Sequence, residues 1–343
     1  MLTEKQKQEL REHLDKTQNP VFFFDNDVDG LCSFLILQRY CGKGKGVAVK
    51  SFPDLTVDYF KKVQELNADY IFILDKPMVS REFLEKTDQF NIPVVWIDHH
   101  DPDIKIPYSV NYYNPCVNNS KNAPTTYLCY QVSEKKEDLW IAVAGSIADK
   151  FFPDFYSEFK EKYPDLAIDS NDAFEIRYKS DIGKIIKILG FALMDRTTNV
   201  VNMMKFLMKA KTPYEVLEES DENYTMHQRF SQINSKYQKL IGKAEKIKDS
   251  KKLLFFKYSG DLSISSNLAD ELNFKFPGKI IIVAYVSGMK ANISARGKNV
   301  RKIILKSVEG FKDSTAGGHE EAVGAKIKAE NLEEFKRRIE SLI

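Results

Sequence analysis

The stretch Val21-Phe-Phe-Phe-Asp-Asn-Asp-Val-Asp-Gly30 sets a short apolar run directly before three aspartates at alternate positions and a glycine. Two further apolar runs end in the same way, because 70–74 precedes Asp75 and 94–97 precedes Asp98. Uninterrupted apolar runs of this length, separated by amphipathic segments, are typical of parallel strands that are buried on both faces and alternate with helices. The sequence therefore predicts an α/β domain built on a parallel sheet.

The rest of the chain continues this pattern and then changes. After Asp101 we expect no further strand in this domain, and residues 198–250 have a polar, helical pattern. From Lys252 a second α/β region begins. The expected organisation is an N-terminal parallel-sheet domain at 1–197, a helical connector at 198–250 and a smaller C-terminal α/β substrate-binding domain at 251–343. The expected helices of the first 250 residues span 3–15, 31–40, 57–66, 80–86, 124–132, 138–148, 181–194 and 221–248.

The composition is that of an ordinary globular protein. Apolar residues make up 43% of the 343 residues and charged residues 29%. No window approaches the ~18 apolar residues of a membrane span, and the charged N-terminus predicts neither a signal peptide nor an anchor. The four cysteines are irregularly spaced, which argues against a disulfide framework. We therefore expect a cytoplasmic protein without a membrane partner.

The aspartates at the strand ends are the most informative feature. The carboxyl ends of parallel strands meet at one edge of a sheet, where α/β proteins bind ligands. Asp25, Asp75 and Asp98 would therefore converge, and clustered carboxylates repel one another unless a cation lies between them. Any one of them could instead cap the following helix. Three in register predict a metal site.

The first cluster extends this site to Asp27 and Asp29. Alternate carboxylates in a turn can point at one position, and Gly30 permits a tight entry into the next helix. A calcium loop of EF-hand type also begins D-x-[DN]-x-[DN]-G, but it requires a glutamate where this chain has Ile36. The flanking strand also differs from an EF-hand helix, so that alternative is excluded.

Two adjacent histidines, His99 and His100, follow Asp98. They could be core residues satisfied by backbone groups, but one imidazole can bind a metal while the other donates to a phosphate, with Asp98 orienting a ring. Asp149 closes the apolar helix at 139–148 and could bridge back to this cluster. Oxygen and imidazole ligands suit Mn²⁺ or Mg²⁺, and their number suggests two ions, which is typical of phosphate-ester hydrolysis.

The C-terminal region carries a basic segment and a glycine pair. Residues 290–306 contain six lysines and arginines and no acid, and Arg296 precedes a glycine at a strand end. Guanidinium geometry favours bidentate phosphate binding, whereas the lysines could form a solvated helix face. Gly317 and Gly318, in a predicted Gly-rich loop, let backbone amides approach an anion, and His319 could donate to phosphate. The alternative is a plain turn that opens a helix.

These residues resemble a known family. The segments DNDVDG, ILDKP, IDHHD and GSIAD occur in the order of the four motifs of the DHH phosphoesterases, and the Ser-Ala-Arg strand and GGH segment resemble the associated C-terminal domain. The resemblance implies one Mn²⁺ held by Asp25, Asp27 and Asp75. It implies a second held by Asp29, Asp75, His99 and Asp149. It further implies that His100 contacts the scissile phosphate, that Asp98 supports the histidines, and that the substrate is bound by Arg296, Gly317, Gly318 and His319.

The D-x-D-x-D-G form of the first motif is similar to RecJ-type single-strand exonucleases, while the compact two-domain layout is similar to nanoRNases. Lys76, directly after Asp75, departs from the residues more common there, and its orientation stays open. We expect a Mn²⁺-dependent phosphodiesterase that converts single-stranded DNA or RNA, or short oligonucleotides, to nucleoside monophosphates. The alternatives are hydrolysis of 3′-phosphoadenosine 5′-phosphate or a cyclic dinucleotide, or a catalytically silent replication scaffold. Polarity and oligomeric state stay open.

Overall fold

The computed structural model describes residues 1–343 except 52, 102–104, 119–121 and 248–251. The chain divides into two compact units, Met1–Phe230 and Ser231–Ile343. The division falls within helix α12, Tyr224–Ala244. The domain limits expected at 197 and 250 stay predictions.

The first unit is built on a five-stranded sheet in which every neighbouring pair is parallel. Its order is β2-β1-β4-β6-β7. The strands are β1 Pro20–Asp25, β2 Lys45–Val49, β4 Tyr70–Leu74, β6 Val94–Ile97 and β7 Val110–Tyr113. The predicted parallel-sheet domain is therefore confirmed.

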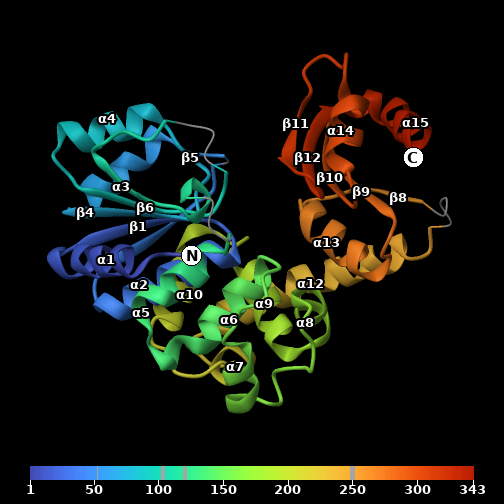
Figure 1. The fold of residues 1–343 in the computed structure, drawn as a ribbon. Helices are drawn as coiled ribbons and strands as arrows, with labels where there is room; N and C mark the ends of the chain where they lie inside the picture. The colour runs from blue at the N-terminus through green and yellow to red at the C-terminus, as the bar shows by residue number, and fades with distance from the viewer. Residues whose placement is uncertain (52, 102–104, 119–121, 248–251) are drawn as a thin grey trace. The chain divides into compact units, whose positions relative to one another are not determined.

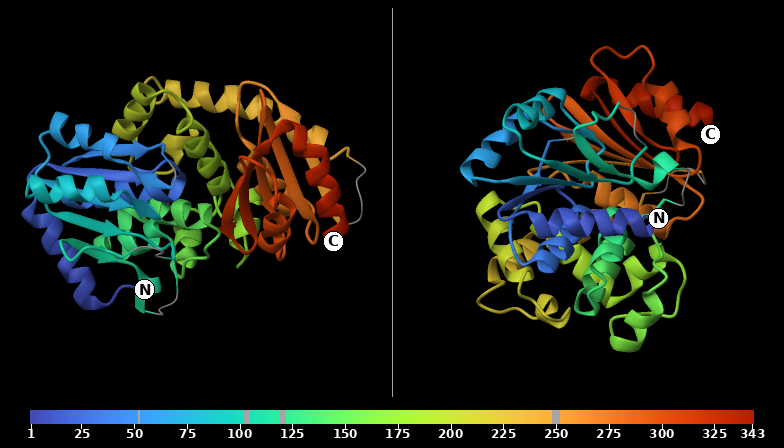
Figure 2. Two further views of the ribbon diagram at one scale, coloured as in Figure 1. Left: turned by 90° about the horizontal axis from the view of Figure 1, so that it is seen from above. Right: turned by 60° about the vertical axis from the view of Figure 1, so that its left-hand side comes forward.

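Helices cover both faces of this sheet (Figures 1 and 2). Along β1, Phe22 and Phe24 join the core beneath α2 and α6, whereas Val21 and Phe23 join a separate core beneath α3 and α4. Successive strand residues point to opposite faces, so a run of four apolar residues fills two cores. The helices that form these layers are α1 Glu4–Lys16, α2 Val28–Cys41, α3 Phe60–Glu65, α4 Arg81–Gln89, α5 Thr125–Ser133 and α6 Leu139–Ala148.

Further helices complete the first unit, and two short strands form a separate parallel pair. The helices are α7 Tyr156–Lys162, α8 Ala173–Lys179, α9 Asp181–Ala192, α10 Thr197–Leu207 and α11 Tyr214–Leu217, and the strands are β3 Asp54–Leu55 and β5 Met78–Val79. The structure contradicts the expectation that no strand follows Asp101, because β7 pairs with β6. The middle residues of β7 are only half-buried, so its sequence lacks an apolar run.

The second unit contains a mixed five-stranded sheet of order β11-β12-β10-β9-β8, in which only β8 and β9 are parallel. The helices α14 and α15 pack on one face over an apolar core, and α13 contacts β9 and β10. The smaller C-terminal α/β domain is therefore confirmed. Its elements are β8 Leu253–Ser259, α13 Ser265–Lys275, β9 Ile280–Ser287, β10 Lys290–Arg296, α14 Val300–Val308, β11 Thr315–His319, β12 Ala322–Lys328 and α15 Leu332–Leu342.

The Gly-rich segment in this unit is not the predicted loop. Gly317, Gly318 and His319 belong to β11, an edge strand that pairs antiparallel with β12. Exposed glycines carry no strand pattern in sequence, and here pairing to a neighbour makes the strand. In the part of the chain that the structure describes, no helix combines the length and the apolar character needed to cross a membrane.

Candidate metal centre

The three strand-end aspartates lie at the same edge of the first sheet. Asp25 is the last residue of β1, and Asp75 and Asp98 directly follow β4 and β6. Backbone hydrogen bonds to the neighbouring strands fix Asp75 and Asp98. The Asp75 amide donates to the Ile97 carbonyl (3.0 Å) and the Asp98 amide to the Tyr113 carbonyl (3.1 Å). Both side chains are buried. Asp75 has a φ of +59°, a left-handed conformation that is uncommon outside glycine and costs free energy.

The turn after β1 is shaped by Gly30. A Cβ at this position would lie 2.4 Å from the carbonyl oxygen of Asp25, so only glycine fits. Asp27 caps α2, because its carboxylate accepts from the Gly30 amide at 2.9 Å. The close approach predicted for Gly30 is confirmed, and Asp27 combines the cap with its place in the acidic cluster.

Asp29 has a second role that the sequence did not reveal. Its two carboxylate oxygens accept the backbone N–H groups of Thr125 (2.9 Å) and Thr126 (2.7 Å) at the start of α5. A carboxylate at a helix N-terminus satisfies unpaired donors and complements the helix dipole. Asp29 is 3% exposed, so it ties α2 to α5 inside the core.

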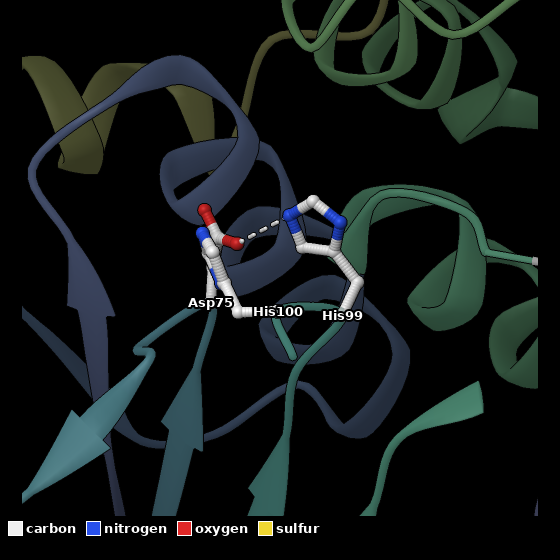
Figure 3. Close-up of side chains that lie close together, drawn as sticks. All are labelled: Asp75, His99 and His100. Carbon is white, nitrogen blue, oxygen red and sulfur yellow. Dashed lines mark ion pairs between the residues drawn. The ribbon is translucent and has the colours of Figure 1, made fainter. Parts of the chain in front are cut away.

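His99 lies at the middle of the cluster. Its Nε2 is 3.3 Å from Asp75 Oδ1, 3.7 Å from Asp149 Oδ2 and 3.9 Å from Asp29 Oδ2. Figure 3 shows the His99 ring directed at the Asp75 carboxylate, with His100 beside it. Ligands about 2.0–2.3 Å from one ion are themselves about 3–4 Å apart. The donor set and its spacing therefore fit a divalent cation.

The described residues contain two groups whose ligand atoms all lie within 4.8 Å of one another. The first group is Asp75, His99 and His100, and the second is Asp29, His99 and Asp149. The structure thus brings together Asp29, Asp75, His99 and Asp149, the set that the resemblance implies for one ion. Neither group includes Asp25 or Asp27.

The negative charge of the cluster favours the binding of a cation. Burial raises the pKa of Asp75 well above the usual range for a carboxyl, and the charges of Asp29, Asp27 and Asp25 raise it further. Four carboxylates at one sheet edge are therefore costly to ionise together. A divalent ion between them would remove that cost, which agrees with the spacing around His99.

His100 and Asp98 form a separate pair. His100 Nδ1 lies 2.8 Å from Asp98 Oδ1, and the His100 amide donates to Asp98 Oδ2 at 3.2 Å. Burial alone would lower the pKa of His100, but the hydrogen bond and the charge of Asp98 outweigh it, so the pKa is raised. Asn114, which sequence reasoning missed, donates to the His100 carbonyl at 2.7 Å. It follows the unexpected strand β7, so no pattern in the sequence indicated its place here.

Lys76 faces the acidic cluster. Its side chain is fully buried, and Nζ donates to Asp25 Oδ1 (2.8 Å) and to the Ser51 carbonyl (2.9 Å). The Trp96 indole N–H donates a hydrogen bond to the Lys76 carbonyl at 2.9 Å. The orientation that the sequence left open is therefore toward Asp25, one of the predicted ligands.

In the second unit, Arg296 and His319 lie at one level of the sheet, because both are paired in register with Ala322. Residues opposite one another in antiparallel strands share a face, so both belong to the face that α13 covers. Arg296 is buried, and its guanidinium binds Asp270 (2.9 Å and 3.4 Å) and the Ser266 hydroxyl (2.8 Å). Most of its donors thus serve the fold of this unit.

The glycines before His319 lie on the exposed strand β11. Gly318 has a φ of +136°, and a Cβ there would lie 2.4 Å from the Ala322 carbonyl oxygen. Glycine is therefore required for this strand to pair closely with β12. The structure brings Arg296, Gly317, Gly318 and His319 to one end of the second sheet.

Comparison with protein families gives two matches that together span more than half of the chain. Residues 21–149 match the DHH family, N-terminal domain, and residues 250–343 match the DHHA1 domain. No curated protein sequence matches.

Several solved structures share the fold. RecJ from Thermus thermophilus, in complex with Mn²⁺, has a TM-score of 0.70 at 16% identity over 98% of this chain and 54% of its own. Exonuclease RecJ bound to manganese has a TM-score of 0.63 at 16% identity over 98% and 93%. CDC45 from Entamoeba histolytica has a TM-score of 0.55 at 11% identity over 98% of both chains.

This chain spans about half the length of Thermus RecJ, and likeness at such identity establishes the fold alone. The two domain matches carry the assignment further, since they occur in the order DHH and then DHHA1. The chain therefore belongs to the DHH family of phosphoesterases, a family of hydrolases, and has a RecJ-like architecture.

Proposed function

We propose that this protein is a Mn²⁺-dependent phosphodiesterase that releases nucleoside monophosphates from single-stranded nucleic acid or short oligonucleotides. The observation that carries the proposal is the position of His99, whose Nε2 lies 3.3–3.9 Å from three carboxylates on three separate segments. Such convergence of imidazole and carboxylate ligands is what a catalytic Mn²⁺ or Mg²⁺ site requires. Structural relatives with Mn²⁺ and with Mg²⁺ support this choice of metal.

Two metal subsites are proposed around Asp75. The first is formed by Asp29, Asp75, His99 and Asp149. The second is formed by Asp25, Asp27 and Asp75. When bound, such ions activate water as a nucleophile and stabilise the charge that develops on the phosphate oxygens.

The remaining residues would position the substrate. Asp98 holds Nδ1 of His100, which fixes the ring so that its other nitrogen can contact the scissile phosphate. In the second unit, the β11 glycines, His319 and Arg296 would receive the terminal phosphate or nucleotide. Asp270 and Ser266 already engage the Arg296 guanidinium, which would fix its orientation for that contact.

Product analysis with Mn²⁺ on labelled DNA and RNA of 2, 5 and 20 nucleotides tests the proposal. We expect nucleoside monophosphates from wild type and from His227→Ala, a histidine of α12 that contacts the Val216 carbonyl, but not from His99→Ala or Asp75→Ala. Cleavage restricted to the dinucleotide would indicate a nanoRNase-type enzyme for short oligonucleotides. Hydrolysis of 3′-phosphoadenosine 5′-phosphate or cyclic dinucleotides instead of these strands would favour the small-substrate alternative. Absence of both Mn²⁺ binding and cleavage would refute the enzyme and favour a silent scaffold.

A further inference from the structure

Asp25 is paired with a cation of the protein itself, the ammonium group of Lys76. Lys76 is fully buried, and its ammonium lies 2.8 Å from Asp25 Oδ1. A further hydrogen bond, at 2.9 Å, goes to the Ser51 carbonyl. Because the side chain has no exposed surface, it cannot contact a substrate. Its effect on the centre is therefore electrostatic.

The consecutive residues Asp75 and Lys76 contact different members of the cluster. Asp75 Oδ1 lies 3.3 Å from His99 Nε2 and accepts from the Thr125 hydroxyl at 3.2 Å. Lys76 extends to Asp25 instead. The His99 side of the cluster thus has anionic and neutral ligands, whereas the Asp25 side already holds a positive charge.

Lys76 is also held in place. Trp96 Nε1 donates to its backbone carbonyl at 2.9 Å, and Asp75 before it is fixed by sheet bonding to Ile97. Separating a buried ammonium from its carboxylate leaves an uncompensated charge and is strongly unfavourable. An ion that took Asp25 as a ligand would have to share that carboxylate with Lys76 and lie close to a like charge.

We propose that Lys76 makes the two metal subsites unequal, so that the chain keeps one tightly bound Mn²⁺ at Asp29, Asp75, His99 and Asp149 and binds a second ion at Asp25 only weakly. This inference rests on the proposed metal-dependent function. Repulsion between like charges a few ångströms apart, even at an effective dielectric constant of about 20, weakens binding by at least about tenfold.

The test is Mn²⁺ stoichiometry of the full chain, measured by equilibrium dialysis with paramagnetic resonance of the free ion. Wild type should hold one tight ion. Lys76→Met keeps the length of the side chain and removes its charge, so a second ion should bind at least about tenfold more tightly. The matched control is Lys43→Met, whose ammonium contacts the Thr17 carbonyl away from the centre, and it should behave as wild type.

A second variant keeps the inference testable if Lys76→Met does not fold. Asp25→Asn should retain the tight ion, whereas His99→Ala should lose it. Two tight ions in wild type, an unchanged second site in folded Lys76→Met, or loss of the tight ion in Asp25→Asn would overturn the inference and leave the proposed function intact. No Mn²⁺ binding by wild type would overturn the proposed function itself.

Discussion

Asp29 offers a sharp test of the architecture, because its structural role can be separated from metal binding. The Asp29→Ala substitution removes the acceptors of two buried N–H groups, at Thr125 and Thr126. Hydrogen bonds to a charged acceptor contribute about 1.5–3 kcal/mol each. Removing Asp29 also relieves its repulsion with Asp75 and Asp27, which offsets part of this loss. We therefore expect the free energy of unfolding of the metal-free protein to fall by about 2–4 kcal/mol, a large part of the stability of a typical domain.

The assay is urea and thermal unfolding in EDTA, followed by circular dichroism. At roughly 2–4 °C per kcal/mol, the Tm of Asp29→Ala should fall by about 4–16 °C. Asp88→Ala is the matched control, because Asp88 is an exposed residue of α4 away from the cluster and surface substitutions change stability by about 0.5 kcal/mol or less. If Asp29→Ala unfolds within about 1 kcal/mol of wild type, Asp29 does not hold α5 and the reasoning fails.

Three further predictions concern the same unit. Gly30→Ala should lower Mn²⁺ affinity at least about tenfold in the dialysis assay, because its Cβ would lie 2.4 Å from the Asp25 carbonyl oxygen. The control is Gly190→Ala, whose Cβ would meet only a methyl group at 3.5 Å, and it should bind Mn²⁺ normally. Mn²⁺ at 100 times its Kd should stabilise wild type by about 2.7 kcal/mol in thermal scans. His99→Ala should not be stabilised by Mn²⁺, and equal stabilisation of this variant would contradict the proposed site. Burial alone would raise the pKa of Asp69, but hydrogen bonds from the segment between α1 and β1 lower it. The stability that ionised Asp69 contributes is therefore complete above the ordinary carboxyl pKa and is lost as pH falls through the lowered pKa. Asp69→Asn should therefore flatten the loss of stability that urea titrations measure as pH falls below the ordinary carboxyl pKa. An unchanged acid limb would refute this.

The sequence predicted the strands that carry the site because apolar runs buried on both faces have a plain signature. It failed at β7, where only the terminal residues Val110 and Tyr113 are buried and the middle is half-exposed. That miss also concealed Asn114, which supports His100. The prediction of a loop at the β11 glycines was wrong, because an edge strand of small residues depends on pairing with a neighbour rather than on its own pattern.

The site residues show a similar division. The aspartates at strand ends could be placed together because parallel strands end at one edge. The cap that Asp29 provides could not, since its partners lie 96 and 97 residues along the chain. Likewise, the sequence flagged Lys76 as unusual without its direction, because a lysine after a strand can turn to solvent or inward. Only the packed structure shows its ammonium against Asp25.

The most direct test of the central claim is hydrolysis of single strands of 2, 5 and 20 nucleotides in ¹⁸O-labelled water with Mn²⁺, followed by mass spectrometry of the products. Attack by water on the phosphorus predicts nucleoside monophosphates that carry one ¹⁸O on the phosphate, absent with His99→Ala. Intact strands in the presence of bound Mn²⁺, or cleaved products without the label, would contradict the account.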